Sequence, residues 1–142
     1  MDARRIEADT WVLVFHKGDD PVSLLEGFAR EQGLTAASFT AIGAFRGAVL
    51  GYFDRDRREY DEIPVEEQVE VLSLLGDVAV GEGEPKVHAH AVLGRRDGST
   101  VGGHLLRGEV WPTLELVLRA APAHLRKRRD PETGLALIDL SA

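Results

Sequence analysis

Residues 87–106 read VHAHAVLGRRDGSTVGGHLL, and this stretch decides how the chain folds. Val87–Leu93 and Thr100–Leu106 are rich in apolar and β-branched residues, a pattern that is typical of strands. An Asp-Gly pair at 97–98 lies between them, and this pair favours the tight turn of a hairpin. The stretch therefore predicts two neighbouring antiparallel strands, which together carry three histidines.

His88 and His90 are two residues apart on the first of these strands, so their side chains point to the same face. Their separation along the strand axis is about 6.6 Å. Two imidazoles at that spacing can chelate one divalent metal ion, because the metal–nitrogen bonds of a zinc site are about 2.0–2.1 Å long. A third ligand has to come from a neighbouring strand, where His104 is the candidate.

The geometry of the turn decides whether His104 joins the pair. A two-residue loop places Leu105 opposite His90 and turns His104 to the other face. A three-residue loop, with Gly98 in the left-handed position, places His104 opposite His90 and brings all three rings together. A bulge at Gly102-Gly103 has the same effect from the first register, since one extra residue reverses the facing. The residues alone leave these alternatives open.

The rest of the chain is predicted to hold one main N-terminal helix and mostly strands. Asp19 and Asp20 are candidates for the N-cap, Pro21 suits the first helical position and Gly33 is a natural stop. Further strands are expected at residues 10–15, 36–42, 48–53, 68–75, 77–80, 113–118 and 135–140, with a kink at 43–47, a break at 76, a loop or edge hairpin at 54–61 and a polar connection at 122–134. The pattern indicates a single α+β domain over residues 1–142 (core about 5–140), compact and mainly antiparallel.

The composition fits this reading. A chain of 142 residues, 44% of them hydrophobic, can bury a substantial core, since chains of about 150 residues bury roughly 68–70% of their unfolded surface. The absence of cysteine excludes disulfides and thiolate ligands and is consistent with a reducing compartment. No apolar run approaches the roughly 18 residues that a membrane span requires, and no signal peptide is evident. We expect a cytoplasmic protein without a membrane partner.

The net charge of −7 argues against nucleic acid as a direct partner, because binding to a duplex depends on Lys and Arg neutralising phosphates. The one strongly basic run is Arg126–Arg129, which we interpret as a solvated loop. That run keeps a DNA-associated regulator as an alternative function.

Several segments, taken in order, resemble the PPC domain (plants and prokaryotes conserved domain). These segments are Phe39–Ala44, Gly51–Asp54, Glu70–Gly76, His88–His90, Gly102–Leu105 and Asp130–Leu135. The resemblance extends from Arg5 to Leu140. The ordered set is specific, whereas any one segment alone is a weak signal.

The resemblance implies a compact antiparallel sheet of the kind shared with acetolactate decarboxylase, assembled as a homotrimer. It implies that His88, His90 and His104 hold a divalent metal, with zinc favoured, and it thereby favours the register in which they converge. Plant members attach AT-hook motifs to the domain, but this sequence has no Gly-Arg-Pro core flanked by basic residues. The analogy with those DNA-binding proteins therefore fails at the part that touches DNA.

Three histidine ligands leave a fourth position on zinc open, as in catalytic sites, and water bound there can reach a pKa near 7. Glu115 alternates with Thr113 and Val117 along one strand face and is the candidate acid/base residue. Arg107 and Arg46 are candidates to hold an anionic substrate. We predict a metal-binding homotrimer that acts on a small anionic molecule by an unspecified reaction, with a trimeric scaffold or the DNA-associated regulator as alternatives.

Overall fold

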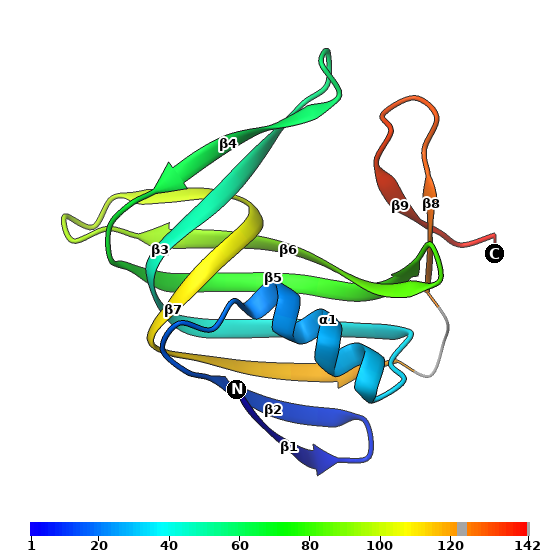
Figure 1. The fold of residues 1–142 in the computed structure, drawn as a ribbon, viewed down its shortest axis with the longest axis horizontal. Coiled ribbons are helices and arrows are strands. Elements are labelled where there is room, and N and C mark those ends of the chain that lie inside the picture. The colour runs from blue at the N-terminus through cyan, green and yellow to red at the C-terminus, as the bar shows by residue number, and fades with distance from the viewer. Residues whose placement is uncertain (122–124, 142) are drawn as a thin grey trace.

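The computed structural model describes residues 1–121 and 125–141. The elements are β1 (Asp2–Glu7), β2 (Thr10–Phe15), α1 (Pro21–Glu31), β3 (Ala36–Asp54), β4 (Glu59–Val65), β5 (Val69–Gly81), β6 (Glu84–Gly94), β7 (Thr100–Ala120), β8 (Arg126–Arg129) and β9 (Ala136–Asp139). All the strands belong to one curved sheet, and α1 lies across it (Figure 1).

Four long strands set the shape of this sheet. β3 pairs with both β5 and β7, and β6 pairs with the same two strands, so the four close into a hydrogen-bonded ring. β1 and β2 extend the sheet beyond β7, and β4 pairs with the C-terminal half of β3. The β8–β9 hairpin joins β5 through one parallel bridge, between Val80 and Arg126. Every other pairing is antiparallel, which confirms the predicted α+β class.

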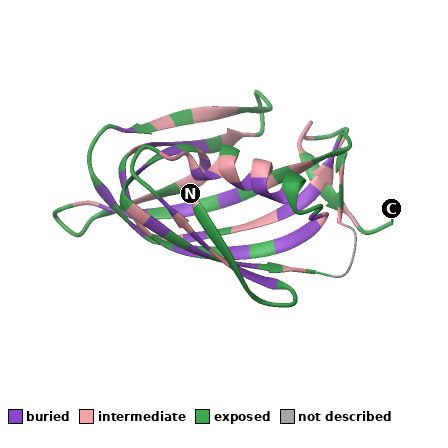
Figure 2. Ribbon diagram, turned by 60° about the horizontal axis from the view of Figure 1, so that its bottom comes forward, coloured by how far each residue is buried: buried purple, intermediate pink, exposed green. Residues whose placement is uncertain are grey.

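Alternating side chains of the strands form the core, and α1 covers part of it. Figure 2 shows buried and exposed residues alternating along the strands, as the period of two requires. On β7, Leu114, Leu116 and Leu118 are all fully buried. The helix contributes Phe28, whose ring meets the edge of Trp11 at a centroid distance of 6.2 Å.

The helix begins and ends where the sequence predicts. The Asp20 side chain accepts a hydrogen bond from the Ser23 backbone N–H at 3.3 Å, which caps the first turn. Gly33 adopts a φ of 65°, and the Leu34 N–H donates to the Ala29 carbonyl at 2.8 Å, as in a Schellman cap. Within the described residues, no helix is long and apolar enough to cross a membrane.

The predicted kink at 43–47 falls on irregular pairing but does not separate two strands, and the predicted break at Gly76 is wrong, because the chain stays extended through both. In β3, register shifts between residues 41 and 47 absorb the irregularity without ending the strand. In β5, the absence of a side chain on Gly76 lets two neighbours approach closely. A Cβ at Gly76 would lie 2.3 Å from Cζ of Phe39 and 2.5 Å from the carbonyl oxygen of His88.

Other boundaries also differ from the sequence-based expectation. Residues 100–106 and 113–118 belong to one strand, β7, and residues 54–61 take the hairpin alternative, leading from β3 into β4. The run Arg126–Arg129 forms β8 and is not a loop, because it pairs with β9 and joins β5. Residues 122–124, at the start of the expected polar connection, lie outside the described residues.

We expect Gly76→Val to destabilise the fold by about 1–3 kcal/mol or more, because the added carbons would overlap Phe39 and the β6 backbone. Urea unfolding followed by circular dichroism measures this. Gly27→Ala is the matched control, because a Cβ at that position meets nothing within 4 Å. This variant should be at least as stable as wild type, since alanine is about 1 kcal/mol more favourable than glycine inside a helix. A Gly76→Val protein as stable as wild type would contradict the close approach described here.

Candidate metal centre

The three histidines come together because the hairpin between β6 and β7 has a three-residue loop. The Arg95 N–H donates to the Ser99 carbonyl at 2.8 Å, and Gly98 adopts a φ of 83°. This loop places His90 directly opposite His104. One of the two registers left open by the sequence is thereby selected, and it is the register in which the rings converge.

The spacing of the rings matches what a single metal ion requires. The centroids of His88, His90 and His104 lie 5.1, 5.2 and 5.5 Å apart, and one ligand nitrogen from each lies within 4.8 Å of the others. Nε2 of His88 and Nε2 of His90 are 3.2 Å apart. Two nitrogens bound to one tetrahedral zinc at about 2.0–2.1 Å would be about 3.3 Å apart.

The environment of the cluster disfavours a positive charge on two of its rings. Burial, together with charge on His88 and His90 and with nearby Lys127, lowers the pKa of His104 to about 4. Burial and the charge on His88 also lower the pKa of His90. Nδ1 of His104 is buried and has no hydrogen-bond partner among the described residues. Neutral imidazoles with an unsatisfied nitrogen suit a metal ion, since ligation needs the deprotonated ring.

Asp77 lies on β5 directly across from His88 and contacts its ring. Its Oδ2 lies 3.5 Å from Nδ1 of His88, and its Oδ1 lies 3.1 Å from Nζ of Lys127. Burial raises the pKa of Asp77, but the contacts with His88 and Lys127 outweigh it and lower the pKa overall. A carboxylate behind a ligating histidine fixes its tautomer and leaves the other nitrogen for the metal. Asp77 was not among the candidates predicted from the sequence, although an acidic residue inside an otherwise apolar strand is a usable signal.

Tyr60, on β4, packs against the remaining side of the cluster. Its ring stacks on His104 at a centroid distance of 4.8 Å and an interplanar angle of 27°. The tyrosine reaches this position across Gly51 of β3, where a Cβ would lie 2.7 Å from Cδ1 of Tyr60. A glycine within a strand often marks such a close approach. Gly51 is therefore a sequence signal for this contact, although its partner Tyr60 is identified only by the tertiary structure.

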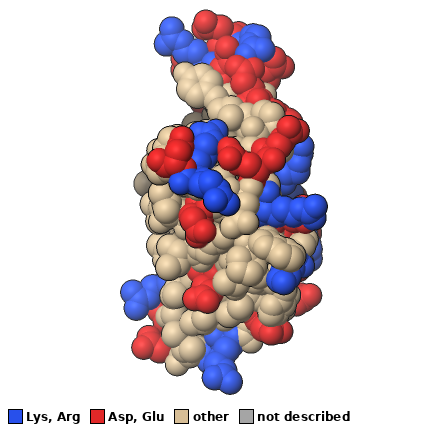
Figure 3. All heavy atoms as spheres, turned by 90° about the vertical axis from the view of Figure 1, so that its left-hand side faces the viewer, with Lys and Arg blue, Asp and Glu red and all other residues tan. Residues whose placement is uncertain are grey.

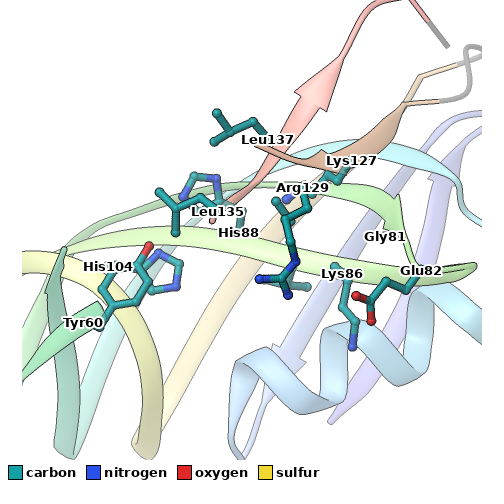
Figure 4. Close-up of a pocket in the computed structure, with 12 residues that line it drawn as sticks. Tyr60, Gly81, Glu82, Lys86, His88, His104, Lys127, Arg129, Leu135 and Leu137 are labelled. Carbon is teal, nitrogen blue, oxygen red and sulfur yellow. The ribbon is translucent and has the colours of Figure 1, made fainter. Parts of the chain in front are cut away.

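A cavity of about 380 Å³ opens beside His88 and His104 (Figure 4). Most of its lining surface is apolar, and cationic side chains come from β6 and β8. The residues that line it are Tyr60, Gly81, Glu82, Lys86, Val87, His88, His104, Lys127, Arg129, Leu135, Ala136 and Leu137.

The other candidates from the sequence lie elsewhere. Glu115 is exposed on β7 and lines shallow hollows that contain none of the three histidines, so its acid/base role stays a prediction. Arg46 pairs with Glu109 at 3.3 Å and Arg107 with Glu62 at 3.7 Å. Neither arginine lines the cavity beside the three histidines, so the structure does not bring them to a ligand there.

The model of the Plants and Prokaryotes Conserved (PCC) domain family matches residues 5–122, and this chain belongs to that family. It is the family that the ordered sequence segments resemble, so the resemblance is confirmed. The matched span contains all three histidines, whereas the β8–β9 hairpin lies beyond its end.

Solved structures agree with this assignment. A protein from Bacteroides thetaiotaomicron, described as a candidate DNA-binding protein, is 25% identical with a TM-score of 0.94, covering 99% of this chain and 98% of that one. A metal-containing protein from Archaeoglobus fulgidus is 37% identical with a TM-score of 0.84, covering 97% and 99%. A Staphylococcus aureus protein described as similar to alpha-acetolactate decarboxylase is 12% identical with a TM-score of 0.53, covering 86% and 54%, which is a likeness of fold alone.

Among curated proteins, the bifunctional protein GlmU from Synechococcus sp. (strain JA-3-3Ab) is 32% identical over 120 residues. The match covers 82% of this chain, but the chain spans only 18% of the length of that relative. The similarity therefore concerns one segment of a much longer protein.

The depressed pKa of His104 predicts how acid affects the metal-free protein. Native His104 stays neutral until about pH 4, whereas the unfolded chain takes up that proton near the ordinary histidine pKa of 6.5. Between these values the unfolded state binds more protons, so the free energy of unfolding should fall as the pH falls from 6.5 towards 4. Urea unfolding of chelator-treated protein at pH 7 and pH 5 measures the loss, which His104→Gln should reduce. If His104→Gln loses as much unfolding free energy between pH 7 and pH 5 as wild type does, the loss does not come from His104.

Proposed function

We propose that this chain is a metal-binding PPC-family domain in which His88, His90 and His104 hold one divalent ion. The observation that carries the proposal is the convergence of three imidazoles with Nε2 atoms of two of them 3.2 Å apart. The similar protein from Archaeoglobus fulgidus, described as metal-containing, supports it. Zinc is favoured by the tetrahedral spacing, although imidazole ligands also accept nickel, copper and iron.

The surrounding residues suit a site that handles a small molecule. When bound, a divalent ion with three protein ligands keeps a position at which water is activated or a ligand oxygen is polarised. Asp77 orients His88, Tyr60 packs on His104, and burial raises the pKa of Tyr60, so its hydroxyl stays protonated. The adjoining cavity gives a small, anionic molecule room beside the histidines.

We also propose that the domain assembles as a homotrimer. Ile42, Leu72, Leu75 and Val117 line one hollow on the outer face of β3, β5 and β7, and each is 47–63% exposed. Contiguous exposed apolar patches on a soluble domain are usually covered by a partner. The family resemblance implies that two further copies of the chain cover this hollow.

A DNA-associated role has weaker support from this chain. The basic run on β8 does not present one continuous surface, because Lys127 is only 5% exposed and pairs with Asp77, while Arg128 pairs with Asp139 at 3.0 Å. Figure 3 shows positive and negative groups interspersed over one face of the molecule. Scattered opposite charges do not attract a polyanion as a basic stripe does.

Metal analysis tests the proposed centre. We expect protein purified without an affinity tag to take up one divalent ion per chain, and His90→Ala to lose this uptake because two imidazoles hold the ion far more weakly than three. Elemental analysis and cobalt absorption spectra measure it. His16→Ala is the control, since the His16 ring is exposed and lies 3.1 Å from Asp2, away from the three histidines. Uptake that is equal in all three proteins would show that the ion binds elsewhere.

Analytical ultracentrifugation tests the assembly. Leu75→Glu should shift the protein from trimer to monomer, because it introduces a charge into the apolar hollow on the outer face. Leu140→Glu, at a site that is 88% exposed and outside the hollow, should leave the sedimentation coefficient unchanged. A wild-type protein that sediments as a monomer would remove this part of the proposal.

A further inference from the structure

We infer that the cavity beside the histidines binds a ligand with an anionic head group and a short apolar body, and that Arg129 on the β8–β9 hairpin, with Lys86, holds the head group. The inference rests on the proposed function, because the ligand would lie next to the proposed metal centre. It adds the chemical class of the ligand and the residues that select it.

The cationic side chains that line the cavity differ in how far they are already paired with carboxylates. Lys127 is already occupied, since it is almost fully buried and its Nζ lies 3.1 Å from Asp77. Lys86 is only loosely engaged, with Nζ 4.0 Å from Glu26. Glu82 is the one carboxylate in the lining. Lys86 is therefore partly compensated by Glu26 and Glu82, which leaves Arg129 as the least engaged cation of the lining.

Arg129 is the cation best placed to take a ligand. Among the described residues no carboxylate lies within 4.0 Å of its guanidinium, which donates only to the Gly134 carbonyl at 3.1 Å. Figure 4 shows its side chain extending from β8 into the cavity, with the guanidinium between His104 and Lys86 in that view. A guanidinium binds carboxylates and phosphates in a bidentate fashion, which gives both affinity and orientation.

The remaining lining predicts the rest of the ligand. Val87, Leu135, Ala136 and Leu137 supply an apolar wall, and Tyr60 closes the side next to His104. Ligand pockets are typically about 300–1,000 Å³, so a cavity of about 380 Å³ fits a small molecule. The lining thus suits a short apolar chain that carries one acidic group.

The position of these residues in the chain separates two roles. The histidines lie inside the span that the family model matches, whereas Arg129 and the apolar residues 135–137 lie beyond residue 122. The Val80–Arg126 bridge and the Lys127–Asp77 ion pair attach the hairpin directly to β5, beside the centre. Residues of the β6–β7 pair would hold the ion, and the β8–β9 hairpin would supply the surface that contacts the ligand.

The test is an NMR titration of the full chain, both metal-loaded and chelator-treated, with three probes of similar shape. The probes are 4-methylpentanoate, butyl phosphate and the neutral 4-methylpentanamide. We expect one or both acids to bind, and the amide to bind at least about ten-fold more weakly, since charge-assisted hydrogen bonds contribute about that much. The comparison of the two acids distinguishes a carboxylate ligand from a phosphate ester.

Variants assign the effect to Arg129. Arg129→Gln should weaken binding of the preferred acid about ten-fold or more, and Arg129→Lys should recover part of it because the charge is retained. Arg128→Gln is the matched control, since that neighbour pairs with Asp139 and does not line the cavity. Thermal unfolding of each variant confirms that the hairpin change leaves the fold intact.

The outcomes separate this inference from the metal proposal. Equal affinity in Arg129→Gln and Arg128→Gln, equal binding of acid and amide, or no binding of either acid overturns the inference. Dependence on Arg129 in a protein that takes up no metal supports the anion site and removes the metal centre. Stoichiometric metal uptake, together with ligand binding that does not depend on Arg129, supports the metal centre and overturns the anion site.

Discussion

The pairing of β6 with β7 is the constraint on which the rest of this structure depends. Side chains of a strand alternate between two faces, so a slip of one residue would turn His104 away from His90. The three-residue loop, with Gly98 at positive φ, prevents that slip. The same pairing completes the ring of four strands, so the fold and the candidate metal centre are determined by one register.

Close backbone approach then builds the surroundings of the centre. Gly76 lets β5 pack tightly against Phe39 and β6, and Gly51 lets Tyr60 cross β3 to reach His104. Both positions require glycine, since a Cβ at either one would overlap a neighbouring residue. Burial of the His104 ring lowers its pKa to about 4, and the pKa of the more exposed His90 is lowered in the same direction, so a charge is disfavoured on both rings.

The basic run on β8 shows how burial changes the meaning of a charge pattern. In the sequence, Arg126–Arg129 is a block of four cations and suggests either a solvated loop or a surface for DNA. In the structure, alternation along a strand divides the block: Lys127 turns inward to Asp77, and Arg128 pairs with Asp139. Arg129 is left at the mouth of the cavity, which makes ligand recognition a better account of it than nucleic-acid binding.

The sequence by itself determined the fold class, the capped helix, the hairpin and the identity of the three histidines, because periodicity and turn residues are local signals. Strand continuity through Gly76, the inward turn of Lys127 and the contacts of Asp77 and Tyr60 were beyond its reach, because they depend on partners far away in the chain. The choice between two hairpin registers belongs to the same group: both are locally acceptable, and only packing of the whole sheet selects one. The sequence therefore determined which charged and aromatic side chains the domain contains, and the tertiary structure decided which of these side chains contact one another.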